Sequence, residues 1–445
     1  MKKHILYIMC GAMLLSSCSV YKSYQSTETV RPDLYSEVAQ QSQGENLAAL
    51  GWQNLFTDPD LQALIAKALQ NNTDLQTAML TLQEAEVAHK TSKLAYLPTI
   101  LFSPNAVVSK LGSADAIKAY DLGVDVSWTL DILGGGITNA RRQAKAGAAY
   151  AADLKQAVEC RLIATLIEDY YALLALDRKA EIHRQTIQLW SENLDMLKAL
   201  YEYGYYKSPA VHQATASLAG IKAQMLDIED QRHAIEIELC RILGEPAYEI
   251  KRGSLSNFKL PEQIGIGVPA DLLSNRPDVR AAERNMEMEF YNVLQKKGAF
   301  FPGITIDGRG AWMEPKSWFI SGIGSLVQPI FMQGKLRADL KIAKIGQQKA
   351  LIAFRQKVID AGAEVHEALH DCNLRKEKAP LVDEQVTELN EAYKATRELM
   401  TNGTSTYLEV ITAQDNLLTA QLAQVENSYQ SAIALIRLYT ALGGK

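Results

Sequence analysis

The sequence predicts a protein that combines membrane-length β-strands with very long α-helices, arranged as two repeats of one unit. Landmark residues recur about 200 positions later in the chain. The pairs include Asn71 and Asn275, Asp74 and Asp278, Pro98 and Pro302, Gly204 and Gly403, and Leu243-Gly244 and Leu442-Gly443. Between these landmarks each half shows the same order: a helix, two alternating strands, then two long helices. This combination indicates a tube that crosses an outer membrane.

The first residues are predicted to be a targeting signal rather than part of the fold. Two lysines precede a short apolar run over residues 5–15, and Leu15-Ser16-Ser17-Cys18 ends it. This pattern is typical of a signal peptide, residues 1–17, and a Cys at the cleavage point resembles the bacterial lipobox. The alternative is an ordinary secretion signal followed by a chance Cys. Because Ser19 rather than Asp follows, a lipidated Cys18 favours the outer membrane.

Composition excludes some classes of function. Loss of Lys2 and Lys3 with the signal leaves 44 basic residues against 51 acidic ones, which argues against nucleic-acid binding. No later stretch is apolar over the length of a membrane-spanning helix, so a mature chain that crosses a membrane must do so with strands. Cys160, Cys240 and Cys372 lie far apart without zinc-site spacing, and a disulfide between two of them stays open.

After a lipidated arm at 18–57, the first repeat (58–244) begins with a helix. Asp58-Pro59 is a helix start signal, and we expect one helix from there to about Tyr96. Strands are expected at 99–111 and 119–131. From Tyr120 onward, apolar and polar residues alternate without interruption for twelve positions. Such a strand suits one face in lipid and the other in water.

The second repeat (271–445) has strands expected at 302–314 and 318–330. A soluble sandwich with one buried face would show the same alternation, but the flanking helices favour a barrel. Four strands cannot close a barrel, because the smallest outer-membrane barrels have about eight. The protein must therefore form an oligomer, and strand counting leaves a dimer or a trimer open.

Two long helical hairpins follow the strands. We expect helices at 136–203 and 208–244 in the first repeat, and at 334–402 and 405–442 in the second. Pro380 should interrupt the third of these helices. A segment at 245–270, rich in Pro and Gly, links the repeats as an irregular patch. Helices of roughly 100 Å cannot form one compact core, so they should pack side by side as coiled coils.

Several segments resemble TolC-like outer-membrane efflux proteins, and the lipidated OprM/NodT branch is the most similar. The resemblance rests on residues 268–283 (Val-Pro-Ala-Asp-Leu-Leu-Ser-Asn-Arg-Pro-Asp-Val-Arg-Ala-Ala-Glu), 329–338, 403–414, and the entry segment Trp52 to Pro59. It covers essentially the whole mature chain. It implies a homotrimer whose twelve-stranded barrel continues into a helical periplasmic tunnel.

The resemblance also implies a function: the exit duct of a tripartite efflux system in the outer membrane. The expected partners are a periplasmic adaptor protein, an inner-membrane transporter of the RND type and outer-membrane lipid. Members of this family are conduits, so no catalytic residue and no cofactor is expected. The alternative is a periplasmic coiled-coil scaffold or adaptor, although adaptors do not carry four amphipathic strands in two repeats.

The family's gate residues map just after the second helix turn. Leu408 and Glu409 match positions that narrow the aperture, while Thr412 stands where many relatives have a further acid. Three copies of Glu409 would suit cations. The alternative is that Glu409 is a solvated residue near a helix cap.

The two helix turns are the expected docking site for the adaptor. The residues concerned are Gly204, Ser208, Gly403, Thr404 and Thr406. Gly204 and Gly403 are expected to adopt positive φ, which glycine tolerates.

His366-Glu367-Ala368-Leu369-His370 matches the H-E-x-x-H pattern of zinc peptidases. The pattern lies in the middle of a long helix, and no third histidine follows at a suitable spacing. We therefore expect no metal site, and the zinc peptidase remains the least favoured alternative.

Overall fold

The computed structural model describes residues 21–26, 50–109, 117–261, 275–313 and 317–444. The predicted signal peptide, Cys18 and most of the expected arm lie outside the described residues. The chain divides into two compact units. Unit 1 contains 78–155 and 278–358 together with the segment at 21–26, and unit 2 contains 50–77, 156–277 and 359–444.

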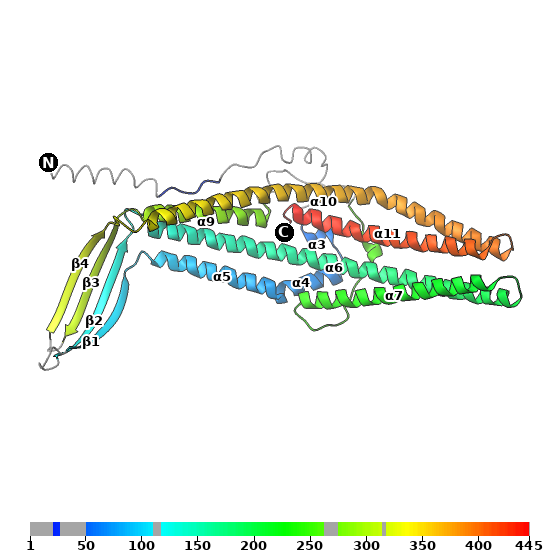
Figure 1. Ribbon diagram of the computed structural model, residues 1–445, viewed down its shortest axis with the longest axis horizontal. Coiled ribbons are helices and arrows are strands. Elements are labelled where there is room, and N and C mark those ends of the chain that lie inside the picture. Colours follow the sequence, from blue (N-terminus) through cyan, green and yellow to red (C-terminus); the bar gives the residue numbers. More distant parts are fainter. Residues whose placement is uncertain (1–20, 27–49, 110–116, 262–274, 314–316, 445) are drawn as a thin grey trace. The chain divides into compact units, whose positions relative to one another are not determined.

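Unit 1 contains one antiparallel sheet of four strands in the order β1-β2-β3-β4. The strands are β1 (Thr99–Ser109), β2 (Ile117–Leu130), β3 (Gly303–Met313) and β4 (Ser317–Val327). They lie side by side in chain order, and the pairing of β2 with β3 joins the two halves of the chain (Figure 1). β4 ends three residues earlier than expected, because its last partner is Gly303 and Pro302 has no N–H to extend the ladder.

Each strand joins a helix of the same unit at one end. These helices are α5 (Thr73–Leu94), α6 (Gly136–Glu202), α9 (Pro277–Gly298) and α10 (Lys335–Thr401), of which α5, α6 and α10 also continue into unit 2. Gly134 and Gly298 approach each other so closely that a Cβ on Gly298 would lie 2.0 Å from the carbonyl oxygen of Gly134. Only glycine fits at this crossing of two connections.

The single helix expected from Asp58 to Tyr96 is wrong, because Asn72 separates α4 (Pro59–Asn71) from α5. The backbone of Asn72 is extended, with ψ of 126°, and its side-chain oxygen accepts a hydrogen bond from the N–H of Leu75 at 3.0 Å. Asparagine is among the preferred N-cap residues, so it ends one helix and starts the next. The start at Asp58 is as expected, since its carboxylate caps Asp60 N–H at 2.9 Å.

Unit 2 consists of helices around one large apolar cluster and a second, smaller one. Besides α4 and parts of α5, α6 and α10, it holds α3 (Trp52–Leu55), α7 (Ser208–Ile242), the 3-10 turn η3 (Leu255–Asn257) and α11 (Tyr407–Ala441). α6 pairs with α7 and α10 pairs with α11 as antiparallel hairpins (Figure 1). Trp190, Tyr170 and Phe56 are the largest fully buried side chains of the core.

The expected interruption at Pro380 is also wrong, because α10 continues through it. Pro380 is exposed, so water can bond the carbonyl group that the missing proline N–H leaves. Cys160, Cys240 and Cys372 are free thiols, which excludes a disulfide among them in this structure. Among the described residues, no helix is both long and apolar enough to span a membrane.

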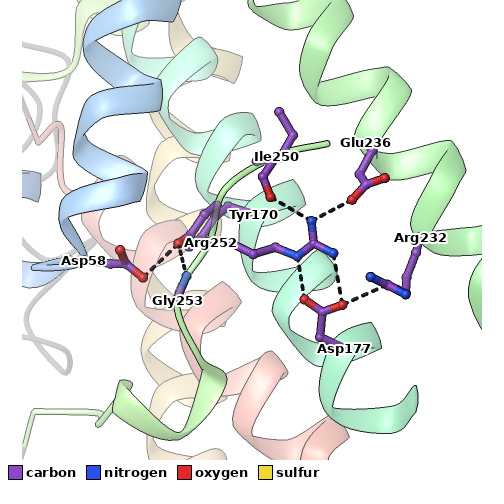
Figure 2. A network of polar contacts seen from close by, with 8 residues as sticks. All are labelled: Asp58, Tyr170, Asp177, Arg232, Glu236, Ile250, Arg252 and Gly253. Carbon is purple, nitrogen blue, oxygen red and sulfur yellow. Dashed lines mark hydrogen bonds and ion pairs between the residues drawn. The ribbon is translucent and has the colours of Figure 1, made fainter. Parts of the chain in front are cut away.

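A polar network fastens the linker to the helices of unit 2 (Figure 2). Arg252 donates to both carboxylate oxygens of Asp177 at 2.5 and 3.1 Å, and to Glu236 at 2.6 Å. Next to it, the Tyr170 hydroxyl donates to Asp58 at 2.8 Å and accepts from Gly253 N–H at 3.0 Å. The linker is therefore held by α6, α7 and the cap of α4 at once.

Candidate channel wall and helix turns

One face of the sheet is apolar over most of its described length. Directly paired residues of antiparallel strands point to the same side, and the even-numbered residues of all four strands share this face. The larger apolar side chains there are Ile100, Phe102, Val108, Tyr120, Leu122, Val124, Val126, Trp128, Leu130, Ile304, Ile306, Trp312, Trp318, Ile320 and Leu326. Most of them are exposed. An exposed apolar patch of this extent marks contact with a membrane or a partner.

The opposite face carries a lattice of polar side chains. Arg309 of β3 forms ion pairs with Asp121 at 2.8 Å and Asp125 at 3.5 Å, both on β2. The Ser127 hydroxyl donates to Asp307 at 2.7 Å. Gly123 lies between the two aspartates, where a Cβ would come within 2.9 Å of the Arg309 guanidinium. Leu101, Phe319, Ile323 and Val327 are exposed apolar residues on this face. A wall with one such face suits contact with water.

The two helix turns have the same backbone hydrogen bonds, 199 positions apart. Tyr205 N–H donates to Leu200 and Gly204 N–H to Tyr201, both at 3.0 Å. At the second turn, Thr404 N–H donates to Leu399 at 2.9 Å and Gly403 N–H to Met400 at 3.1 Å. Gly204 and Gly403 have φ of 81° and 74°, as a left-handed helix cap requires.

The start of the return helix differs between the turns. At the second turn, Thr406 and Glu409 form a capping box, and the Glu409 carboxylate accepts from Thr406 N–H at 3.1 Å and from the Ser405 hydroxyl. These hydrogen bonds, the one from Ser405 first, lower the pKa of Glu409. At the first turn, Lys207 offers no side-chain cap and Pro209 lies within the first turn of α7.

The structure places the predicted gate and docking residues at these turns. Leu408 is 63% exposed, Glu409 is exposed, and the Thr412 hydroxyl donates to the Leu408 carbonyl at 2.8 Å. Ser208 is the first residue of α7, and Thr404 follows Gly403 in the second turn. Glu409 therefore forms part of the cap of α11, and its side chain remains exposed.

An aromatic contact that the sequence reading missed joins the two turns. Tyr206 and Tyr407 meet edge to face, with ring centroids 6.4 Å apart. Burial raises the pKa of Tyr407 to about 12, and Asp415 adds to the shift. Each tyrosine follows the glycine of one of the two equivalent turns, Tyr206 by two positions and Tyr407 by four, and this proximity was the signal in the sequence. The two turns are therefore in contact through these rings.

His366 and His370 are exposed on α10. Across the described ranges, no group of three or more His, Cys, Asp or Glu side chains could hold a metal ion.

Comparison with known proteins decides the family. A family model described as outer membrane efflux protein matches residues 64–245 and 268–444. The chain belongs to the outer membrane efflux protein family. It is 25% identical over 409 residues to the probable outer membrane lipoprotein SilC of Salmonella typhimurium, covering 88% of each chain. It is 24% identical over 452 residues to the cation efflux system protein CusC of Escherichia coli K12, covering 98% of each.

The fold agrees with this assignment. The solved structure of the outer-membrane channel OprN matches with a TM-score of 0.87 and 23% identity, over 95% of this chain and 98% of that one. The resemblance to TolC-like efflux proteins, the function as an outer-membrane channel of a tripartite efflux system, and the outer-membrane location are therefore confirmed. The family consists of channels rather than enzymes.

Proposed function

We propose that three copies of this efflux channel close one barrel of twelve strands, four from each, and that their helical hairpins form a tunnel. The open sheet supports this proposal, since β1 and β4 are edge strands among the described residues. An unpaired edge is costly in lipid, where backbone groups have no water to bond. Pairing of β1 in one copy with β4 in the next satisfies both edges.

The orientation of the sheet follows from its two faces. The apolar face meets lipid, and the polar face with Arg309, Asp121 and Asp125 lines the water-filled lumen. The internal two-fold repeat is supported by the equal hydrogen bonding of the two turns at a spacing of 199 residues. The helix ends add to this support, since Glu245 N–H donates to Cys240 as Gly444 N–H donates to Tyr439.

The remaining assignments concern the ends of the duct. Cys18 carries the lipid anchor, as in the relative that is named a probable outer membrane lipoprotein. Leu408, Glu409 and Thr412 form the periplasmic constriction, which their position just after the second turn supports. The turns with Gly204, Ser208, Gly403, Thr404 and Thr406 dock the periplasmic adaptor, which couples the duct to an inner-membrane transporter of the RND type.

Planar-bilayer recording tests the duct and its constriction together. Glu409→Gln is the informative variant, because glutamine can keep the capping box while the charge is lost. Glu202→Ala, an exposed acid at the end of α6 beside the first turn, is the matched control. We expect discrete cation-selective steps whose selectivity falls in Glu409→Gln and is unchanged in Glu202→Ala. Equal selectivity in all three proteins would remove the constriction from Glu409 and keep the duct.

A further inference from the structure

The helix ends that adjoin the sheet are unusually basic. Within the seven helical residues nearest the sheet, α5, α6, α9 and α10 carry nine basic side chains and one acidic one, Asp339. The basic residues are Lys90, Lys93, Arg141, Arg142, Lys296, Lys297, Lys335, Arg337 and Lys341. The whole chain has a net charge of −5, so an excess of basic residues at these helix ends is opposite in sign to the charge of the chain. We call these nine residues the basic girdle.

Helix electrostatics explain only half of the girdle. Lysines in the last turns of α5 and α9 are favourable at the negative end of a helix dipole. At the starts of α6 and α10 the dipole is positive, so Lys335 and Arg337, in the first turn of α10, are unfavourable there. Neither helix has an acidic residue in its first turn to offset them. Negative charge outside the protein would favour basic residues at the ends of α5 and α9 and also at the starts of α6 and α10.

Most of the girdle has no ionic partner within the part of the chain that the structure describes. Lys335 pairs with Asp339 at 2.9 Å, and Arg142 donates to the carbonyls of Tyr21 and Lys22 at 3.0 and 3.2 Å. The other seven form no ion pair within 4.0 Å of a described residue, although the charge of Lys296 contributes to lowering the pKa of Asp339, after that of Lys335. Asp131, which precedes α6, accepts from the backbone and hydroxyl of Thr138 at 2.7 and 2.6 Å, so its charge is directed to the start of that helix rather than to a girdle residue.

Exposed apolar side chains lie between the girdle and the strands. The strand register brings the starts of β1 and β3 and the ends of β2 and β4 to one edge of the sheet. Figure 1 shows the four helices meeting the strands along this edge. Ile330 and Phe331 of the β4–α10 connection are 95% and 82% exposed, and Leu97, Ile132 and Phe300 are exposed at the other three connections. Exposed apolar side chains therefore lie at all four connections between the strands and the girdle.

The segment at 21–26, just after the predicted lipidation site, contacts the connections and helices that carry the girdle. The Tyr21 hydroxyl donates to the carbonyls of Asp131 and Ile132 at 3.0 and 3.1 Å. Tyr24 contacts Phe290 of α9 edge to face, with ring centroids 5.7 Å apart. The segment at 21–26 is thus fastened beside the girdle, three residues after Cys18.

We propose that the basic girdle binds the anionic headgroups of phospholipids at the membrane surface, while the apolar connections enter the acyl region beneath them. The proposal rests on the channel assignment above, which puts the apolar face of the sheet in the bilayer. The headgroup layer of a leaflet is roughly 6 Å deep, which the long side chains of two helical turns can span. An anionic membrane surface is the occupant that matches the charge, the apolar border and the fastened N-terminal segment together.

Lipid retention by the whole protein tests the proposal. Detergent-extracted protein is mixed with phosphatidylglycerol or with zwitterionic phosphatidylcholine, and bound lipid is counted by native mass spectrometry. We expect phosphatidylglycerol to bind preferentially at low salt, and the preference to shrink in high salt. The variant carries Lys93→Gln, Lys297→Gln and Arg337→Gln. Each substitution should weaken phosphatidylglycerol binding by about fivefold and leave phosphatidylcholine unchanged.

The control carries Lys222→Gln, Lys259→Gln and Lys378→Gln, which removes the same charge from exposed lysines elsewhere. It should retain the wild-type preference. Equal binding of the two lipids by the wild-type protein, or equal loss in both variants, would overturn the proposal. Channel recordings in phosphatidylcholine bilayers distinguish failure of the lipid proposal from failure of the channel assignment. A channel should conduct whether or not the girdle selects lipids.

Discussion

Removal of the Arg252 guanidinium should loosen the linker from the helices of unit 2. Arg252 is the centre of the network in Figure 2, and its side chain is only 8% exposed. Arg252→Ala leaves Glu236 without its partner and leaves Asp177 with Arg232 alone, which pairs with it at 2.8 Å. The carbonyl of Ile250 also loses its donor at 2.8 Å.

The size of the effect follows from the burial of these groups. Breaking a buried ion pair by removing one partner costs roughly 3–5 kcal/mol. The side chain of Asp177 is 32% exposed and keeps Arg232, so the lower end of that range applies. A loss of about 3 kcal/mol in the free energy that holds the linker should speed its amide hydrogen exchange by on the order of 100-fold, since about 1.4 kcal/mol is a factor of ten.

Hydrogen exchange measured by mass spectrometry on the detergent-solubilised protein provides the assay. The informative amide is Gly253 N–H, which donates to the Tyr170 hydroxyl beside the network. Lys251→Ala is the control, because its side chain is 89% exposed and its ion pair with Asp60 should contribute at most about 1 kcal/mol. If Arg252→Ala and Lys251→Ala accelerate exchange equally, the network does not hold the linker.

Other predictions concern single groups in unit 2. Burial, together with Glu238 and Glu168, raises the pKa of Asp169 to about 6, so folding stability should fall as the pH rises from about 4 to 6. Asp169→Asn should remove this slope and, with allowance for solvent screening, stabilise the protein at neutral pH by on the order of 1 kcal/mol in unfolding titrations at several pH values. Gly403→Ala should destabilise by about 1 kcal/mol because φ is 74° there, whereas Gly220→Ala, in regular helix with open space around it, should stabilise by about 0.5–1 kcal/mol. Thermal unfolding that gives both glycine variants the same sign would contradict this assignment of backbone strain.

Local patterns in the sequence predicted much of the fold. The alternation from Tyr120 onward located β2, because an amphipathic strand needs only a period of two. The break at Asn72 was missed because good helix formers surround it, although an Asn followed by Thr and Asp is a recognisable cap. At Pro380 the sequence predicted a break that the structure does not have. An exposed helix tolerates a proline, because water can replace the lost hydrogen bond.

The candidate site was less accessible to sequence reasoning. The capping box of Thr406 and Glu409 was readable from their spacing of three residues, and it gives Glu409 a structural role besides its charge. The contact of Arg309 with Asp121 joins residues 188 positions apart. No local pattern fixes the register that brings them together, and the same holds for Arg252 with Asp177.

Closure of the barrel by neighbouring copies is the central claim, and exchange at the sheet edges tests it most directly. Among the described residues of one chain, no strand lies beside the outward backbone groups of β1 and β4. Hydrogen exchange should be measured strand by strand on the detergent-extracted protein. The account predicts that β1 and β4 exchange as slowly as the central strands β2 and β3, because each edge is paired with another copy. Fast exchange of alternate amides along β1 and β4, beside a protected β2 and β3, would show open edges and contradict the closed barrel.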